Sequence, residues 1–555
     1  MCGIVGFIDF TNRSTDHNLI QMISTLNHRG PDGSGFNHLN TSSAQVGLAH
    51  SRLSIIDLST AAAQPMHFDG LYLSFNGEVY NFIEIRNRLI HLGYSFSTTS
   101  DTEVVLKSWH HWGESAISMW RGMFSISIYD SKNENLYLIR DRAGVKPLYY
   151  FWDNDLFLFG SELKSLLPHP GYNKSINEHV LGHFLQYGYI PAPHSIYRGT
   201  RKLLPGHLLR FNIKCRNFTT TSYWNIYEHY LLPKFDISFD TALIETERVL
   251  AEAFELRLVS DVPVGVFLSG GYDSTCVTAL LQKDKTERLR TYTIGTQDST
   301  LNEAPTAKLI ANHLGTDHTE IYCTPDEIKK IIPDLPYIFD EPHADSSSIP
   351  SILISRTAKQ HVTVALSADG GDEIFAGYNR YHYFIRYAKL LQFLPVPLKS
   401  SLSRLLTSHD FSVLPWFRNQ SHIASRFQKI SNLLNCNDSA TTSKNLHHVF
   451  SDAEIDALLL RPNQYLETRF DNNSNYYSSL DDLSNLMAID FETYLTDDVL
   501  TKVDRSSMNA SLESREPFLD HHVVEWAARL PTNFKYKSGV KKYILKEIVH
   551  QHVPS

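Results

Sequence analysis

Val262-Pro263-Val264-Gly265-Val266-Phe267-Leu268 runs directly into Ser269-Gly270-Gly271-Tyr272-Asp273-Ser274, so a short apolar run ends in a glycine-rich turn. A run of this length bounded by turn residues is typical of a buried strand. The residues after the turn, 275–281, have the pattern of a helix. Glycines between a strand and a helix let backbone N–H groups approach a phosphate, and the helix start adds positive potential. The stretch therefore predicts a strand, a pyrophosphate cradle and a helix, in that order.

Strands and helices alternate in the rest of this half. We expect strands at 290–294 and 362–366 and helices at 304–314 and, in part, 481–508. Such alternation implies a parallel sheet covered by helices. The chain has no G-x-x-x-x-G-K-[ST] motif and no convincing G-x-G-x-x-G fingerprint, so neither a Walker A loop nor a dinucleotide fold is expected. The predicted class of this half is an α/β parallel-sheet domain with added helices.

A second glycine-rich turn follows the strand expected at 362–366. It reads Ser367-Ala368-Asp369-Gly370-Gly371-Asp372-Glu373 and places carboxylates on both sides of two glycines. Mg²⁺ prefers carboxylate and phosphate oxygens. By itself the turn could be the acidic start of a helix. Together with the first glycine-rich loop, it favours catalysis on a phosphorylated, metal-bound substrate.

The first half is rich in short strands. Apolar runs at 46–58, 71–79, 123–129, 136–139 and 156–159 are separated by turn residues. Alternation in 124–128, Phe-Ser-Ile-Ser-Ile, is typical of a half-buried strand. Residues 211–235 then become polar and irregular, and we expect the linker between two domains there.

Composition excludes several classes of protein. The 555 residues are 42% apolar with a formal charge of −9, which is ordinary for a globular chain of two to four domains. Such a charge does not favour binding to nucleic acid or to an anionic membrane. No apolar run approaches 18 residues, and the five cysteines show no C-x-x-C spacing. We therefore expect a cytoplasmic protein without a zinc cage or a disulfide framework.

Cys2 has a special chemical position because it follows the initiator Met1. A small second residue usually allows that methionine to be removed, and Cys2 would then carry a free α-amine. An α-amine has a pKa of about 7.7 to 8.0 and can act as the base for its own side chain. The pattern therefore predicts an N-terminal nucleophile.

The surrounding motifs strengthen this prediction, because the first half resembles the class II glutamine amidotransferases. The resemblance is carried, in order, by Cys2-Gly3-Ile4-Val5-Gly6, His28-Arg29-Gly30-Pro31-Asp32-Gly33, His50-Ser51-Arg52-Leu53-Ser54-Ile55-Ile56-Asp57, Phe75-Asn76-Gly77-Glu78-Val79-Tyr80-Asn81 and Ser100-Asp101-Thr102-Glu103. It implies an α+β N-terminal nucleophile fold with α/β/β/α layers. In that fold the Cys2 thiolate would attack the amide of glutamine, and Asn76 with the N–H of Gly77 would stabilise the oxyanion.

The same resemblance implies a glutamine-binding site. Arg52 would pair with the α-carboxylate as a two-pronged donor. Asp101, with help from Glu78, would hold the α-ammonium group. The wall of the site would be completed by Leu53, Ser54, Ile55, Ile56, Asn76 and Gly77.

The S-G-G-x-D-S loop resembles the signature of the N-type ATP pyrophosphatases, and the whole chain resembles the glutamine-hydrolysing asparagine synthetases. Further shared motifs are Leu301-Asn302-Glu303-Ala304, Asp340-Glu341-Pro342, Lys502-Val503-Asp504-Arg505, Glu513-Ser514-Arg515-Glu516-Pro517-Phe518-Leu519-Asp520 and Lys541-Lys542-Tyr543-Ile544-Leu545. The family implies an ATP site formed by Phe267, Leu268, Ser269, Gly270, Gly271, Asp273, Ser274, Ile294, Ser367, Ala368 and Lys542. It also implies Mg²⁺ at Asp273 and Asp372, catalytic support from Asp369, and aspartate binding, on weaker grounds, by Glu513 and Arg515.

The resemblance implies a division of labour along the chain. A glutaminase domain would span 2–210, a linker 211–235, and a synthetase domain 236–555 that lacks the usual C-terminal tail. Ammonia from L-glutamine would convert L-aspartate to L-asparagine through β-aspartyl-AMP, giving AMP, pyrophosphate and glutamate. A homodimer is a further family expectation.

Two alternatives remain open at this point. Ala368 stands where relatives commonly have glycine, so the acceptor could be another carboxylate, such as a sugar acid. The short C-terminus is compatible with a non-catalytic relative that has kept the fold.

Overall fold

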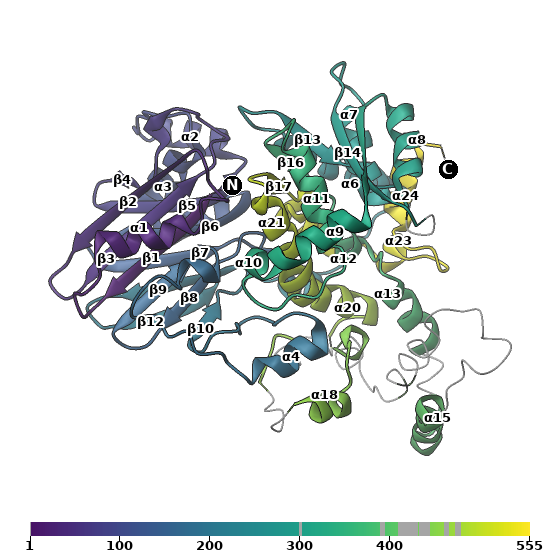
Figure 1. The fold of residues 1–555 in the computed structure, drawn as a ribbon. Helices are drawn as coiled ribbons and strands as arrows, with labels where there is room; N and C mark the ends of the chain where they lie inside the picture. The colour runs from purple at the N-terminus through teal and green to yellow at the C-terminus, as the bar shows by residue number, and fades with distance from the viewer. Residues whose placement is uncertain are drawn as a thin grey trace.

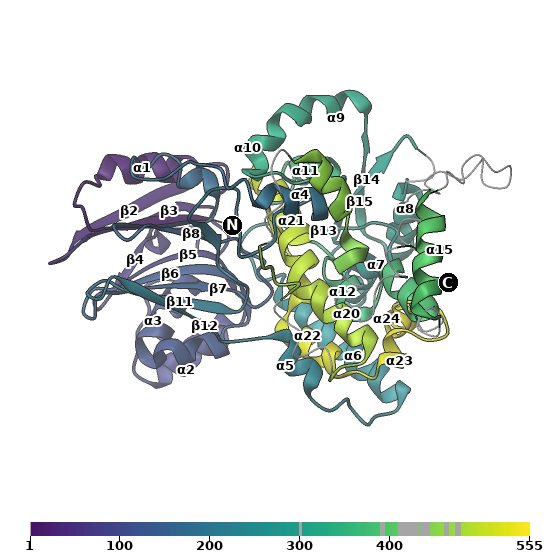
Figure 2. The same cartoon turned by 90° about the horizontal axis from the view of Figure 1, so that it is seen from below.

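The structure is a computed structural model that describes residues 2–298, 302–388, 394–408, 431, 434, 444–459, 466–471 and 479–554. Leu301 of the expected 301–304 motif, Met1 and Ser555 lie outside these residues. Figure 1 shows two parts side by side, a strand-rich part from the first 222 residues and a part in which helices surround a third sheet. The start of the chain lies between them, close to β17 (Glu513–Arg515) and α21 (Leu500–Asn509) in Figure 1 and close to α21 in Figure 2.

Two six-stranded antiparallel sheets form the first part. The first has the order β10-β8-β9-β1-β3-β2, and the second has the order β12-β11-β7-β6-β5-β4. The strands are β1 (Gly3–Asp9), β2 (Gly33–Asn40), β3 (Gln45–Arg52), β4 (Met66–Phe68), β5 (Leu71–Val79), β6 (Gly122–Asp130), β7 (Asn135–Arg140), β8 (Tyr149–Trp152), β9 (Leu156–Gly160), β10 (Thr200–Lys202), β11 (His207–Asn212) and β12 (Asn217–Ser222).

The sheets stack as the inner layers of an α/β/β/α sandwich. Figure 2 shows α1 (Asp16–Ser24) outside the first sheet, and α2 (Phe82–His91) and α3 (Asp101–Trp112) outside the second. Successive side chains of β1 divide between two cores as the period of a strand requires. Ile4 and Ile8 pack between the sheets, whereas Val5 and Phe7 pack under α1. The layered class expected for this half is thus observed.

Two local expectations differ from the structure. The strand 124–128 is buried on both faces, because Ser125 and Ser127, expected to face solvent, point between the sheets and are 0% exposed. The expected linker 211–235 contains β12 and also α5 (Ile226–Leu231). Threonine is β-branched and favours strands, so the polar stretch Thr219-Thr220-Thr221 pairs with β11 as a largely exposed edge strand.

The third sheet is parallel and has the order β15-β14-β13-β16-β17. Its other strands are β13 (Val264–Phe267), β14 (Arg290–Thr296), β15 (Asp317–Cys323) and β16 (Val364–Leu366). The chain leaves β13 towards β14 on one side and returns to β16 on the other. Ligands of open α/β sheets bind outside the carboxyl ends of the strands at such a switch point. Both glycine-rich turns leave strands at this point.

Helices cover both faces of this sheet. Val266 and Leu366 pack against Cys276 and Leu280 of α7 (Tyr272–Gln282), whereas Tyr292 packs on the face near α11 (Ser348–Ala358). The remaining helices are α4 (Val180–Tyr187), α6 (Phe239–Leu256), α8 (Ala304–Leu314), α9 (Pro325–Ile331), α10 (Leu335–Phe339), α12 (Gly371–Phe375), α13 (Asn379–Tyr383), α15 (Val396–Ser408), α18 (Asp452–Leu458), α20 (Asp482–Asp490), α22 (His521–Arg529), α23 (Thr532–Lys535) and α24 (Tyr543–His550). A π-helical stretch, Phe491–Val499, joins α20 to α21. Within the described ranges, no helix combines the length and apolarity that a membrane crossing needs.

Candidate active sites

Cys2 lies directly before β1 and is only 8% exposed. Its backbone N–H donates to Asn76 Oδ1 over 3.1 Å, and its Sγ lies 3.8 Å from the carbonyl oxygen of Leu53. Burial raises the pKa of the Cys2 thiol to about 11. The thiol therefore needs a base before it can act as a nucleophile at neutral pH.

Asn76 and Gly77 sit on β5, beside Cys2. Asn76 Nδ2 donates to Ser125 Oγ over 3.2 Å while its Oδ1 accepts from Cys2, so both ends of the amide are oriented. Gly77 has a φ of +145°, and a Cβ built on it would lie 2.0 Å from the carbonyl oxygen of Met123. Only glycine fits here without moving a strand.

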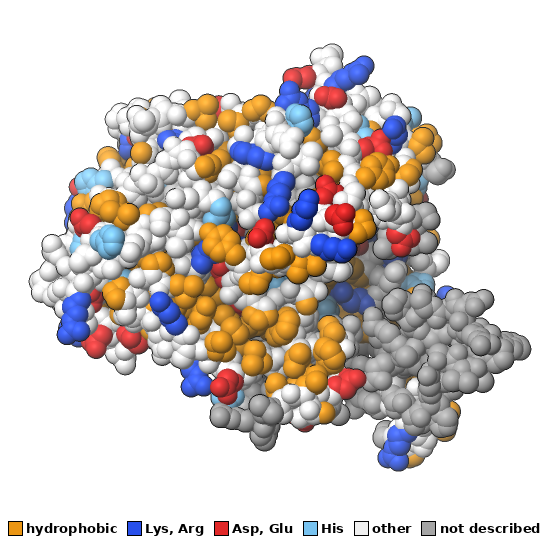
Figure 3. Space-filling view, in the orientation of Figure 1, with side chains coloured by type: hydrophobic (Ala, Val, Ile, Leu, Met, Phe, Trp, Pro, Cys, Tyr) orange, Lys and Arg blue, Asp and Glu red, His pale blue; other side chains and the backbone are white. Residues whose placement is uncertain are grey.

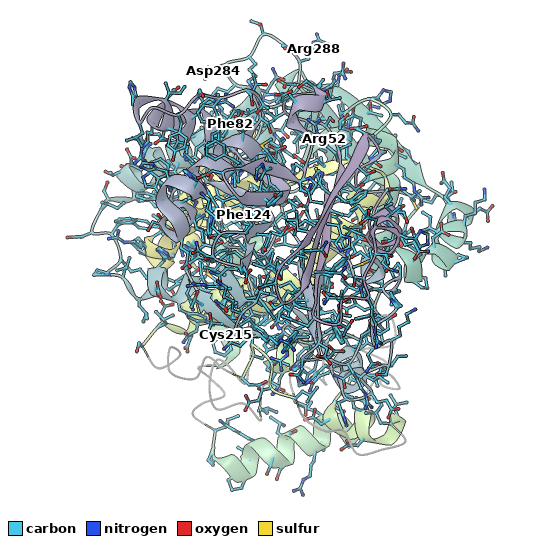
Figure 4. All side chains as sticks on the ribbon, turned by 90° about the vertical axis from the view of Figure 1, so that its left-hand side faces the viewer. Arg52, Phe82, Phe124, Cys215, Asp284 and Arg288 are labelled. Carbon is cyan, nitrogen blue, oxygen red and sulfur yellow. The ribbon has the colours of Figure 1, made fainter. Side chains whose placement is uncertain are left out.

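Arg52 ends β3, at the point labelled in Figure 4. Its Nη1 donates to the carbonyl of Ser59 over 2.7 Å, and its Nη2 donates to the carbonyl of Asp57. These backbone acceptors hold the guanidinium beside the segment 53–56, in which Leu53 and Ile55 are buried. The same segment contacts Cys2 through the carbonyl oxygen of Leu53.

Asp101 and Glu78 form a buried carboxyl pair. Asp101 begins α3, and its Oδ2 accepts from the N–H of Val79 over 3.0 Å. Burial raises the pKa of Asp101 to about 6, and burial together with the nearby Asp101 charge raises the pKa of Glu78 well above its ordinary range. The charge of Asp101 therefore disfavours ionisation of Glu78, while the charge of Arg515, 3.6 Å from Glu78, opposes the shift at Glu78. Together the two carboxyl groups form an acidic pair suited to an ammonium group.

A second site lies at the carboxyl ends of β13 and β16, as the topology predicts. A cavity of about 310 Å³ opens between the two glycine-rich loops. Among the predicted ATP-binding residues, its wall contains Phe267, Leu268, Ser269, Gly271, Asp273, Ser274, Ile294, Ser367 and Ala368. Gly270 instead faces a neighbouring groove, and Lys542 meets the cavity through its contacts with Asp273 and Asp372.

Two serines of the first loop accept hydrogen bonds from its backbone. The N–H of Ser269 donates to Ser274 Oγ over 3.1 Å, and the N–H of Gly271 donates to Ser269 Oγ over 3.1 Å. Gly271 caps α7 and offers no side chain to the N–H groups of the first turn. The N–H groups of this first turn and the positive end of the 11-residue helix suit an anion.

Lys542 lies between two carboxylates of the second site. Its Nζ contacts Asp273 Oδ2 and lies 2.7 Å from Asp372 Oδ1. Burial raises the pKa of Asp273 to about 6, although Lys542 opposes the shift. Among the described residues, Asp273 Oδ1 is buried without a hydrogen-bond partner. Two carboxylates, one with an orphaned oxygen, fit a hard cation such as Mg²⁺ that shares its ligands with a triphosphate.

The second loop brings Asp369 to the same cavity. Ser367 Oγ donates to Asp369 Oδ2. Gly370 has a φ of +95°, and a Cβ there would lie 2.4 Å from Leu519 Cδ2. The glycine therefore lets the loop turn tightly against the chain that follows β17.

Sequence reasoning missed part of the cavity wall, namely Tyr292, Thr293, Glu303, Ile354, Gly370, Glu373, Tyr378 and Val499. Tyr292 and Thr293 precede Ile294 on β14, and Glu303 and Glu373 belong to motifs already noted, so proximity in sequence could have found them. Val499 had no local signal, because a π-helix brings it to the cavity from far along the chain.

Glu513 and Arg515, expected on weaker grounds to bind aspartate, lie on β17. Both are buried on β17, where Arg515 Nε donates to Glu513 Oε1 over 2.6 Å. Arg515 Nη2 lies 3.6 Å from Glu78 Oε1, and neither residue contributes to the wall of the 310 Å³ cavity. Their surroundings favour a role beside the Cys2 site.

A small cavity of about 10 Å³ lies between the two halves. Its volume suits roughly one water molecule. Its wall comes from both halves and contains Tyr80, Gly122, Met123, Asp141, Arg142, Ala143, Val145, Arg257, Glu516, Leu519 and His521.

Comparison with known proteins matches each half of the chain to a family model. A model described as asparagine synthase matches residues 245–555, and one described as a glutamine amidotransferase domain matches residues 1–224. The chain belongs to the asparagine synthase family. It is thus an ATP-dependent carbon–nitrogen ligase of the glutamine-hydrolysing type. The predicted fold class, an N-terminal nucleophile α/β/β/α half before a parallel α/β half, is confirmed.

Relatives in this family match almost the full length. Asparagine synthetase [glutamine-hydrolyzing] 1 of Bacillus subtilis (strain 168) is 33% identical, covering 100% of this chain and 85% of that protein. A Methanocaldococcus jannaschii protein, provisionally named asparagine synthetase [glutamine-hydrolyzing] 2, is 35% identical over 73% of this chain and 82% of its own. The third B. subtilis asparagine synthetase is 29% identical over 100% of this chain and 85% of its own.

Proposed function

We propose that this chain makes L-asparagine from L-aspartate, with L-glutamine as the nitrogen donor and ATP as the activating nucleotide. The observation that carries the proposal is the cavity between the two glycine-rich loops, whose wall combines Asp273, Asp369 and Asp372. A carboxylate accepts ammonia only after one of its oxygens becomes a leaving group. Phosphate-binding N–H donors beside clustered carboxylates are suited to that activation.

Glutamine hydrolysis begins at Cys2. Once Met1 is removed, the Cys2 nitrogen is an α-amine that takes the thiol proton. The thiolate attacks the side-chain amide carbon, and the oxyanion accepts hydrogen bonds from Asn76 Nδ2 and the N–H of Gly77. The α-ammonium returns the proton to the leaving nitrogen, so ammonia departs and a thioester remains. Water then cleaves the thioester, which releases glutamate and restores the thiol.

Glutamine is selected by its two ends. Arg52 pairs with the α-carboxylate, and Asp101, with help from Glu78, meets the α-ammonium. The segment 53–56 forms the wall between these groups and Cys2. Protein-bound glutamine lacks both charged ends and is excluded.

Aspartate is activated at the second site. A β-carboxylate oxygen of aspartate attacks the α-phosphorus of ATP. The bond between this phosphorus and the oxygen that bridges to the β-phosphorus breaks, so pyrophosphate leaves and β-aspartyl-AMP is formed. The N–H groups of the first loop and Lys542 receive the pyrophosphate charge, while Asp369 supports formation of the adenylate. Asp273 and Asp372 would hold Mg²⁺, which when bound neutralises charge on the triphosphate.

Ammonia completes the reaction by attacking the acyl carbon of the adenylate, which expels AMP. Ammonia is protonated in water at neutral pH and then cannot attack, so an enclosed passage is required. The 10 Å³ cavity is lined by residues of both halves and is part of the passage that we propose.

The test compares wild type with Cys2→Ala, supplied with ATP, Mg²⁺ and aspartate plus either glutamine or ammonium. We expect Cys2→Ala to lose glutamine-dependent asparagine formation and to keep the ammonium-dependent reaction, with AMP and pyrophosphate as products. ADP among the products would refute the adenylate. Turnover that does not depend on aspartate would point to another acceptor, and no turnover with either donor would point to a non-catalytic relative.

A further inference from the structure

Arg29 is a charged residue in the interior of the molecule. On the face shown in Figure 3, lysine, arginine and acidic side chains lie scattered at the surface. The Arg29 side chain is instead 0% exposed. A buried guanidinium needs partners for its donors. Arg29 has three, and one of them is the nucleophile residue itself, because Arg29 Nε donates to the carbonyl oxygen of Cys2 over 3.0 Å.

The strongest partner of Arg29 comes from the synthetase half. Asp504, on α21, accepts from Nη1 over 2.7 Å and from Nη2 over 2.9 Å, and its side chain is 2% exposed. Such a two-pronged pair fixes angle as well as distance. The third partner, Glu162, accepts from Nη1 over 2.7 Å. Burial by itself would raise the pKa of Asp504, but the charge and hydrogen bonds of Arg29, together with the charges of Lys146 and Arg505, hold that pKa below its ordinary value.

Glu162 cannot replace Asp504, because Glu162 is shared. It lies 2.8 Å from Arg505 Nη1, 2.6 Å from Lys164 Nζ and 3.2 Å from His28 Nε2. Lys164 and Arg505 also reach Asp340. Without the carboxylate of Asp504, the cluster would hold an excess of positive charge, and Arg29 would be drawn towards Glu162.

Residue 2 is therefore held at both ends of its backbone. Asn76 accepts from its nitrogen, and Arg29 donates to its carbonyl oxygen. The first contact lies within the glutaminase half, whereas the second depends on a residue 475 positions from Arg29. A nucleophile must be held in a productive geometry, and a displacement of about 1 Å can cost about 100-fold in rate.

We propose that Asp504 of the synthetase half is a positioning residue for Cys2, acting through Arg29, so that the glutaminase site is complete only when the two halves are docked. The proposal rests on the proposed glutaminase function of Cys2. It gives a role to the Lys502-Val503-Asp504-Arg505 motif. It also makes the rate of glutamine hydrolysis depend on the position of α21, which follows directly after Val499 of the nucleotide cavity.

The test uses the full chain and the variant Asp504→Asn, which keeps the shape of the side chain and removes its charge. We expect the kcat for glutamate release to fall at least about tenfold, with the KM for glutamine within about twofold because Arg52 and Asp101 are untouched. Ammonium-dependent asparagine formation, measured on the same preparation, reports that the synthetase half is folded.

The matched control is Glu341→Gln. Glu341 pairs with Lys202 across the same interface at 2.7 Å, with side chains 6% and 7% exposed, but touches neither Arg29 nor Cys2. Its glutaminase kcat should stay within about twofold of wild type. An unchanged kcat in Asp504→Asn, or an equal loss in both variants, would overturn the proposal.

Should Asp504→Asn fail to fold, Arg29→Lys replaces it. Lysine keeps the charge, but its single ammonium group cannot donate to the Cys2 carbonyl oxygen and form a bidentate pair with Asp504 at the same time. The same loss of kcat at an unchanged KM is expected, and a wild-type kcat would refute the role. Absence of glutamate release from the wild-type chain would refute the glutaminase assignment instead, so the two failures are distinguishable.

Discussion

Gly77→Ala tests the geometry of the glutaminase centre most directly. The new methyl group would lie 2.0 Å from the Met123 carbonyl oxygen and 2.6 Å from Phe124 Cα, whereas real contacts of a Cβ stay above 3.0 Å. Strands β5 and β6 must therefore move apart by about 1 Å, at a residue whose φ of +145° already disfavours alanine. The N–H of Gly77 moves with its strand. Loss of one oxyanion donor costs about 100- to 1000-fold in kcat, or about 2.7 to 4 kcal/mol.

The assay measures glutamate release and ammonium-dependent asparagine formation on the same preparation. We expect Gly77→Ala to lose the first by at least about 100-fold and to keep the second. Gly33→Ala is the matched control, since a Cβ at Gly33 meets no atom within 4 Å and its φ is ordinary. Glutamate release by Gly77→Ala within tenfold of wild type would show that Gly77 does not donate to the oxyanion.

Three further predictions concern the charged groups. Because burial raises the pKa of Asp101 to about 6, protonation below that pH should raise the KM for glutamine more than it lowers kcat, as initial rates from pH 5 to 8 would reveal. Asn76→Ala should lower the glutaminase kcat by about 100-fold or more and spare the ammonium reaction; equal loss of both would indicate misfolding. Lys542→Met leaves Asp273 and Asp372 unopposed and should cost about 3 kcal/mol at pH 8. The pKa of Asp273, about 6 with Lys542 present, rises further in the variant because Lys542 lowers it. A raised carboxyl pKa contributes stability at low pH that is lost as the pH rises through that pKa, so the denaturant midpoint of the variant should recover towards that of the wild type as the pH falls to 5.

Sequence patterns predicted the strands and helices well where a segment has a single hydrophobic period. The strand expected at 71–79 is β5, and the helix expected at 304–314 is α8, each with the predicted bounds. Helix α7 begins three residues before its predicted start, because Gly271 caps it directly. The predicted linker was wrong at β12. Threonine is polar, which suggested a loop, but its β-branched side chain favours a strand.

The sites were predictable to the extent that their residues lie in contiguous motifs. Asn76 beside Cys2, and the two glycine loops around one cavity, follow from motif order and from the topology of a parallel sheet. The strand order β15-β14-β13-β16-β17 does not follow from any local pattern. Contacts such as Arg29 with Asp504 are equally invisible, because neither residue carries a sign of its distant partner.

Buried ion pairs at the interface suit a chain in which one half releases ammonia and the other half uses it. Removing ions from water costs more than their attraction returns unless the geometry is good, so an apolar contact would hold the halves together at least as firmly. Apolar surfaces can slide past each other, however, whereas the bidentate Arg29–Asp504 pair fixes both distance and angle between the two halves. Ammonia released at Cys2 is lost as a nucleophile once water protonates it. A single docking geometry would keep the proposed passage closed between the two sites. Buried charge would therefore contribute orientation here, where apolar packing would contribute only affinity.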